Sequence, residues 1–122
     1  MALTVNSPLL RQQVVYAHSA SIGATPIAAA IAVPFRGTVI EVGCTPSGTL
    51  TSSNSVTYAV NGTAMSGSPM VMVSTGAGIG VTTSSAPSGL NNVVQGDYIT
   101  FTPGGGAGAA VPGMFYAVIR AG

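Results

Sequence analysis

Two apolar runs joined by an Asn-Gly pair form the clearest pattern in this chain. In the segment 55–73, SVTYAVNGTAMSGSPMVMV, the apolar residues before the pair alternate with small or polar ones. Such alternation gives a strand one buried face. Asn61 and Gly62 both tolerate the positive φ that a two-residue type I′ turn requires. The segment therefore predicts a β-hairpin, with an apolar strand resuming at 70–73, and we place it at the centre of an antiparallel fold.

Short apolar segments between Gly, Pro, Ser and Thr make up the rest of the chain. Strand patterns occur at 11–22, 38–45, 81–85, 91–102 and 114–121. With about eight short strands at this spacing, the pattern predicts an all-β protein: an antiparallel β-sandwich that is jelly-roll-like. Since 122 residues is a common domain size, we assign 1–9 to an N-terminal arm and 10–122 to a single β-sandwich domain.

The alternation also predicts which side chains share a face of the first and last strands. In the first strand, Val14, Tyr16 and His18 fall on one side, and Val15, Ala17 and Ser19 on the other. In the last strand, the two sets are Tyr116, Val118 and Arg120, and Phe115, Ala117 and Ile119. Successive side chains of a strand point to opposite faces of its sheet, so one set of each strand should be buried.

The segment 27–35 is compatible with two structures. Thr25 could cap a helix that begins at Pro26, and alanine favours helices. Pro34 would end that helix early, and short helices are weak on their own. We favour a strand because the surrounding pattern is β, and a helix remains the alternative.

Charged side chains are scarce, at 4% of residues against an average of about 25%. The whole set is Arg11, Arg36, Glu41, Asp97 and Arg120, and the net charge is +1. Nucleic-acid binding needs clustered Lys and Arg, and these arginines are far apart in sequence, so we expect none. A neutral surface protects a monomer poorly against association, which favours a surface covered by other protein over a simply soluble Ser/Thr surface. Attachment to such a partner should tolerate salt, since exposed ion pairs contribute only ~0–1 kcal/mol each.

We expect no membrane association. The most apolar stretch, 27–33, lies between two prolines and is far shorter than the ~20 residues that span a bilayer. Residues 1–10 lack the basic start and continuous apolar core of a secretory signal.

Residues that could perform chemistry are few. His18 is the single histidine, and no Cys/His spacing of the zinc type occurs. Cys44 is the single cysteine, so no internal disulfide is possible. It alternates with Val42 and Ile40 on one strand face, which predicts a buried, inert thiol. His18 and Cys44 could formally act as base and nucleophile, but no acid motif accompanies them.

Glu41 and Asp97 are the only acidic residues, and glycoside hydrolases use such a pair. The chain has no Trp to line a sugar site. A glutamate within a strand more often pairs with an arginine, and Arg36 and Arg120 are available. Asp97 follows Gly96, where it can fix its own turn by accepting backbone N–H bonds. We therefore expect no enzymatic activity, and no catalytic, cofactor-binding or metal-binding residues.

Four segments together resemble small phage virion proteins. They are TVIEV at 38–42, SVTYAVNGTAM at 55–65, VVQGDYITFT at 93–102 and MFYAVIRAG at 114–122. In this order, with a Gly-rich loop before the last strand, they are similar to capsid decoration (cement) proteins over roughly residues 33–122. The resemblance implies an all-β, jelly-roll-like fold, assembly as a homotrimer and the major capsid protein as partner. It carries no catalytic motif.

The resemblance implies a structural virion protein, made in the host cytoplasm and located on the capsid surface, that binds and stabilises the phage head. The alternative is a carbohydrate- or receptor-binding module of a tail fibre, which would expose aromatic side chains in a shallow groove. Only four Tyr and three Phe are present, and we expect most of them to be buried. The alternative therefore ranks second.

Overall fold

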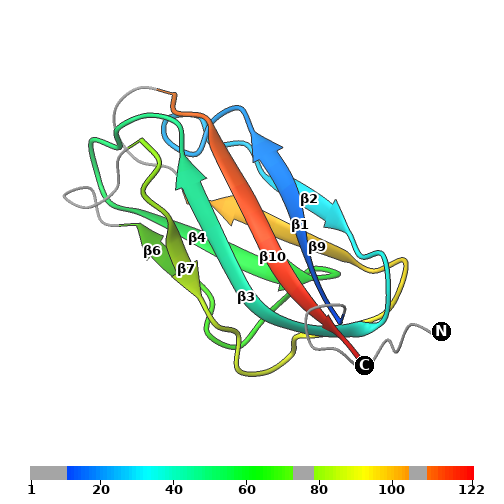
Figure 1. Ribbon diagram of the computed structural model, residues 1–122. Coiled ribbons are helices and arrows are strands. Elements are labelled where there is room, and N and C mark those ends of the chain that lie inside the picture. The colour runs from blue at the N-terminus through cyan, green and yellow to red at the C-terminus, as the bar shows by residue number, and fades with distance from the viewer. Residues whose placement is uncertain (1–10, 73–78, 105–109) are drawn as a thin grey trace, which may run out of the picture.

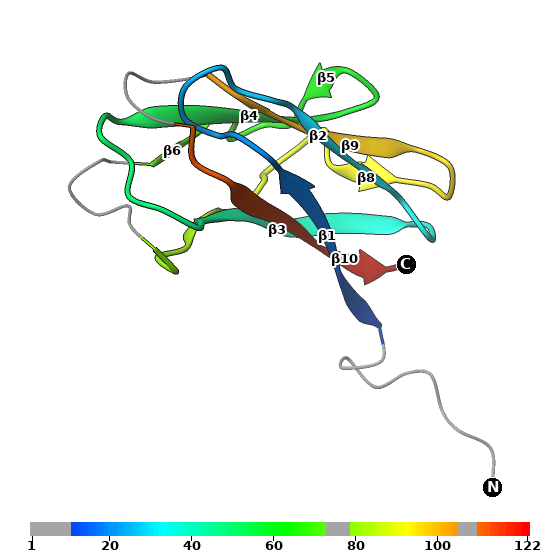
Figure 2. The same ribbon diagram turned by 90° about the horizontal axis from the view of Figure 1, so that it is seen from above.

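Two antiparallel sheets pack face to face in the computed structural model, which describes residues 11–72, 79–104 and 110–122 (Figure 1). The first sheet has the order β1 (Gln12–Ser19), β10 (Gly113–Ala121), β3 (Gly37–Pro46) and β7 (Thr83–Ser85), and β8 (Asn92–Val93) also pairs with β3. The second has the order β2 (Ala29–Ala32), β9 (Tyr98–Pro103), β4 (Asn54–Val60) and β5 (Thr63–Ala64), and β6 (Met70–Met72) also pairs with β4. Figure 2 shows the two layers from above.

The predicted fold class is confirmed: the protein is an all-β, jelly-roll-like antiparallel sandwich. The described residues form ten strands rather than about eight, because β5 and β8 are pairings of only two residues each. The segment 27–35 contains strand β2, so the helical alternative is wrong; Ile31 pairs with Ile99 of β9, and both are buried. The predicted arm, 1–9, and most of the Gly-rich loop lie outside the described residues.

The hairpin at the centre of the sequence pattern forms as predicted. Val60 pairs with Thr63, and the two residues between them have positive φ, 49° at Asn61 and 86° at Gly62. Positive φ at both central positions is the signature of a type I′ turn, whose twist matches that of its strands. Strand β6 then returns to pair with residues 54–56 of β4.

A β-bulge in β3 changes which of its residues reach the core. Val118 pairs with Glu41 and Ile119 pairs with Val39, so Ile40 is an extra residue without a partner in β10. A bulge shifts the alternation by one residue. As a result Val39 and Val42 are both fully buried, whereas Ile40 is half-buried. The prediction that Ile40 shares a face with Val42 and Cys44 is therefore wrong.

Apolar side chains from both sheets fill the space between the layers. The largest fully buried ones include Tyr58, Phe101, Phe115, Ile22, Met65 and Met72. Phe101 of β9 and Phe115 of β10 stack with ring centroids 4.8 Å apart and planes 5° from parallel, and this contact joins the two sheets. Inner residues from both sheets interdigitate in this way in β-sandwiches.

Replacing Gly62 with Val should lower the free energy of unfolding by roughly 1–3 kcal/mol, because a β-branched residue would be forced into positive φ. Nothing lies within 4 Å of the position an added Cβ would take, so backbone strain is the whole effect. Chemical denaturation measures it. Gly62→Asn is the matched control and should lose less, since Asn tolerates this region. Equal stability of the Val variant and the wild type would contradict the turn.

Candidate functional site

The solvent-facing side of β1 and β10 exposes apolar and aromatic side chains. Cross-strand pairs on this side are Val14 with Val118, Tyr16 with Tyr116, and His18 with Met114. These six residues are called the outer face below. Val14 is 41% exposed, Tyr16 64% and Met114 39%. The predicted division of both strands into two faces is confirmed, since Phe115, Ala117 and Ile119 are fully buried.

Tyr116 is held against the sheet by a glycine on the neighbouring strand. Gly43 of β3 is its cross-strand partner, and a Cβ at position 43 would lie 2.3 Å from the Cε1 atom of Tyr116. Only glycine therefore lets the ring lie in this place. The ring of Tyr16 lies beside it, with centroids 6.5 Å apart and an interplanar angle of 53°. The two tyrosines form an aromatic centre within the outer face.

Glu41 accepts a hydrogen bond from the Tyr116 hydroxyl through its Oε2 atom. Burial, with the nearby carboxylate of Glu41, raises the pKa of Tyr116 to about 12, so the phenol stays neutral and donates at physiological pH. The expectation that Glu41 pairs with Arg36 or Arg120 within the chain is wrong for the described residues. The physical reason is that Tyr116 is the diagonal cross-strand neighbour of Glu41, whose direct partner is Val118, and the Tyr116 hydroxyl supplies the donor.

Asp97 fixes its own turn, as predicted. Its Oδ2 atom accepts from the backbone N–H of Val94 at 2.9 Å, and its Oδ1 atom accepts from the side-chain amide of Asn61 at 3.0 Å. Both bonds hold the pKa of Asp97 below its usual value, and the bond from Asn61 has the larger effect. Asn61 in turn accepts from the backbone N–H of Tyr98 at 3.0 Å. The carboxylate therefore joins the turn that follows β4 to the turn that precedes β9, and it has no arginine partner in the described part of the chain.

The structure separates the candidate chemical groups from one another. Cys44 points into the core, where burial raises the pKa of its thiol to about 12. His18 is exposed on the outer face, and so lies on the opposite side of the first sheet. Glu41 belongs to that sheet, whereas Asp97 lies in a turn that leads into the second. Among residues 11–72, 79–104 and 110–122, no three His, Cys, Asp or Glu side chains come together as a metal site would need.

The three arginines meet at one end of the first sheet, which sequence separation alone did not reveal. Arg120 of β10 pairs with Gln12, and the N–H of Ala121 donates to the carbonyl of Arg11 at 2.5 Å. The N–H of Gly122 donates to the carbonyl of Arg36 at 3.3 Å. We call Arg11, Arg36 and Arg120 the arginine end. No local signal in the sequence indicated this, because it depends on the pairing of the first strand with the last.

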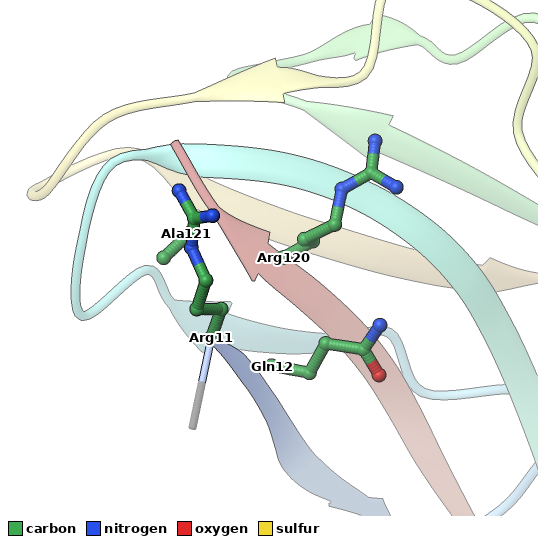
Figure 3. A pocket seen from close by; sticks show the side chains of 4 residues that line it. All are labelled: Arg11, Gln12, Arg120 and Ala121. Carbon is green, nitrogen blue, oxygen red and sulfur yellow. The ribbon is translucent and has the colours of Figure 1, made fainter. Parts of the chain in front are cut away.

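Two depressions lie beside the end of β10. One has a volume of about 340 Å³ and is lined by Arg11, Gln12, Arg120 and Ala121 (Figure 3). The other, of about 300 Å³, is lined by Arg36, Gly37, Asn92, Val93, Val94 and Gly122. All three arginines are exposed, and each lines one of the two depressions.

No helix long and apolar enough to cross a membrane occurs in the described part of the chain.

Comparison with known proteins finds similarity of fold and no similarity of sequence. No protein-family model matches the sequence, and no curated protein resembles it at the sequence level. A chain from the acid-stable capsid of Helicobacter pylori bacteriophage KHP30 is similar in structure, with a TM-score of 0.52 and 12% identity over 89% of this chain and 92% of that one. The CBM36-1 domain of a multidomain xylanase from a Trinervitermes trinervoides hindgut metagenome has a TM-score of 0.52 and 7% identity, over 90% of this chain and 98% of that one.

The catalytic unit of a GH87 α-1,3-glucanase from Streptomyces thermodiastaticus is also similar, with a TM-score of 0.53 and 13% identity over 91% of this chain. The protein spans only 26% of that glucanase chain. At these identities the likeness is one of fold. A jelly-roll-like sandwich occurs both in a phage capsid and in a domain of a xylanase, so function must be argued from the surface.

Replacing Gly43 with Ala should displace the Tyr116 ring, because the new methyl group would clash with it. The hydroxyl would then leave Glu41, and the pKa of Tyr116 should fall from about 12 toward its ordinary value of 10.0. Ultraviolet titration of the phenols measures this, with Tyr116→Phe identifying the contribution of Tyr116. Wild-type stability should also fall as pH rises from 10 to 12, because the unfolded phenol ionises in that range and the folded one does not.

The matched control is Gly48→Ala, whose added methyl would approach no atom closer than 3.3 Å. Its phenol titration should equal that of the wild type. An unchanged titration of the Gly43→Ala variant would contradict the described packing of Tyr116.

Proposed function

We propose that this protein is a non-enzymatic structural protein of a virus particle. In this proposal it is a capsid decoration (cement) protein that assembles as a homotrimer and binds the major capsid protein on the outside of the phage head. The observation that carries the proposal is the outer face, where Val14, Tyr16 and Met114 are exposed on two adjacent strands. Contiguous exposed apolar side chains of this kind mark interaction sites.

The composition of the outer face fits a protein partner. Aromatic residues and Met are enriched at protein–protein interfaces, whereas Lys, Glu and Asp are depleted. The outer face has two Tyr, one Met and two Val, and Glu41 beside it is already bonded to Tyr116. Because these residues stand on paired strands, their positions are fixed before binding, which reduces the entropy lost on association.

The structural neighbours support the proposal without deciding it. The KHP30 capsid chain and this chain align over nearly the whole length of each. A chain of similar size and fold is therefore present in a phage capsid. The residue-level resemblance of segments 38–42, 55–65, 93–102 and 114–122 to decoration proteins points in the same direction.

Carbohydrate binding is the second candidate, and the tyrosine pair favours it. Tyr16 and Tyr116 lie side by side with the carboxylate of Glu41 at hand, a combination of aromatic rings and a polar group that could receive a sugar. The CBM36-1 domain supports this reading by its fold. We rank it second because three of the four other outer-face residues, Val14, Val118 and Met114, are apolar, and His18 is the one hydrogen-bonding group among them. A glycan array tests it, and saturable binding that disappears in a Tyr16→Ala variant would favour this candidate.

Replacing Tyr16 with Ala should weaken attachment to purified phage particles by about tenfold, since exposed tyrosines at interface centres are frequent hot spots. Sedimentation of particles with bound and free protein measures it. Tyr98→Ala is the matched control, because Tyr98 is 47% exposed but belongs to the second sheet. Equal weakening by both substitutions, or by neither, would remove the outer face from the proposal.

The proposed trimer should be visible as a single species of three chains by mass measurement at micromolar concentration. The reason is that further apolar side chains are exposed away from the outer face, among them Ile79, Val81, Leu90 and Val94. Closed symmetric oligomers bury such surface, and the chain has almost no charge to keep copies apart. A monomer across the whole accessible concentration range would contradict the trimer. Attachment to the capsid is tested separately, by the Tyr16→Ala variant.

A further inference from the structure

We propose that the arginine end is the point at which an acidic protein partner docks, with its carboxylate side chains in contact with Arg11, Arg36 and Arg120. This inference rests on the proposed function, in that it specifies the chemistry of the partner surface. It concerns groups that the outer face does not contain.

Every Lys or Arg of the chain lies at this end. The sequence has three such residues, and the fold brings them together from positions 11, 36 and 120. Both acidic side chains are bonded to other groups. Glu41 accepts from Tyr116, and Asp97 accepts from Asn61 and Val94. In the described residues neither acidic side chain is therefore paired with a guanidinium group.

The backbone register explains why the three arginines are neighbours. Strand β10 lies between β1 and β3, so Arg120 has Gln12 on one side and Thr38 on the other. Arg11 and Arg36 lie just outside the paired ends of the two flanking strands. Figure 3 shows the side chains of Arg11 and Arg120 at this end of β1 and β10.

The shape of this end suits carboxylate groups. The two depressions, of about 340 and 300 Å³, open on either side of the end of β10 and have arginines in their lining. A guanidinium group presents a planar fork of donors that can bond both oxygens of a carboxylate at once. A glutamate or aspartate side chain of a partner could therefore enter either depression and meet an arginine there.

The arginine end continues directly into the outer face. Along β1 and β10 the cross-strand pair Gln12–Arg120 is followed on the same side by Val14–Val118 and then by Tyr16–Tyr116. Arg and Tyr dominate the energetics of protein interfaces. One partner could therefore contact the apolar centre and the arginines together, and charge complementarity would fix its orientation.

A protein partner fits better than a nucleic acid. A duplex presents a phosphate charge about every 1.7 Å, and proteins that follow it carry extended basic surface and a high isoelectric point. This chain has a net charge of +1 and a sequence isoelectric point of about 7.9. Three arginines match a small group of carboxylates instead. The composition alone led us to expect attachment that tolerates salt. If the three arginines contact carboxylates, attachment should instead weaken as the salt concentration rises.

Fluorescein-labelled poly-L-glutamate is the probe, titrated with the full chain at low salt. Replacing all three arginines with Gln should weaken binding about 30-fold, and each single replacement about threefold, as for exposed ion pairs. The triple Arg→Lys variant keeps the charge and is the matched control; it should lose less than the triple Gln variant. Amide spectra of the core strands would verify that each variant is folded.

The arginine Nε–Hε signals in nuclear magnetic resonance spectra locate the probe directly, because the chain has only three arginines. All three signals should shift together on addition of poly-L-glutamate. Absence of binding, unchanged affinity of the triple Gln variant, or signals that do not move would overturn the inference. Tighter binding of a DNA duplex than of poly-L-glutamate at the same salt would overturn it in favour of nucleic acid.

The probe experiment contains no virus particle, so its outcome is separate from that of the proposed function. On particles that retain the protein, release of the wild type should increase with sodium chloride, and release of the triple Gln variant should not depend on it. Release of both at the same rate at every salt concentration would show that the arginine end is not at the contact.

Discussion

The contact between Phe101 and Phe115 is the interaction on which the rest of the structure depends. Each ring comes from a different sheet, and the stack at 4.8 Å fixes the layers against each other. Burial of aromatic side chains of this size provides a large part of the stabilisation available to a domain with little charge. It also fixes the outer face, because Phe115 pointing inward requires Tyr116 and Met114 to point outward.

The outer face is therefore built from the core outward. Gly43 has no side chain, so the ring of Tyr116 can lie over β3 at that position. The carboxylate of Glu41 then accepts a hydrogen bond from the Tyr116 hydroxyl. The hydrogen bond from Tyr116 holds the Glu41 carboxylate as a fixed acceptor at the margin of that surface, and Tyr16 is 64% exposed within it.

The arrangement of strands concentrates the positive charge of this nearly neutral protein at one end of the first sheet. Because the first and last strands pair, and β10 also pairs with β3, three distant arginines collect at one end. The two acidic side chains are held by hydrogen bonds to Tyr116 and Asn61 and are not paired with these arginines in the described residues. An apolar surface that ends in a cluster of cations can orient a partner as well as bind it.

Local features of the sequence were sufficient to determine most of the strands, the two faces of β1 and β10, and the turns at Asn61–Gly62 and Asp97. The Asn61–Gly62 turn, the two faces of β1 and β10 and the turn bonds of Asp97 each depend on residues close together in the chain, through φ preferences and a period of two. The bulge at Ile40, the Tyr116–Glu41 bond, the Asn61–Asp97 bond and the arginine end all depend on which strands pair and in what register. Pairing register is set by packing between residues distant in sequence, so no local pattern contains it. The sequence thus determined the sandwich, and the tertiary structure alone decided where its few charges lie.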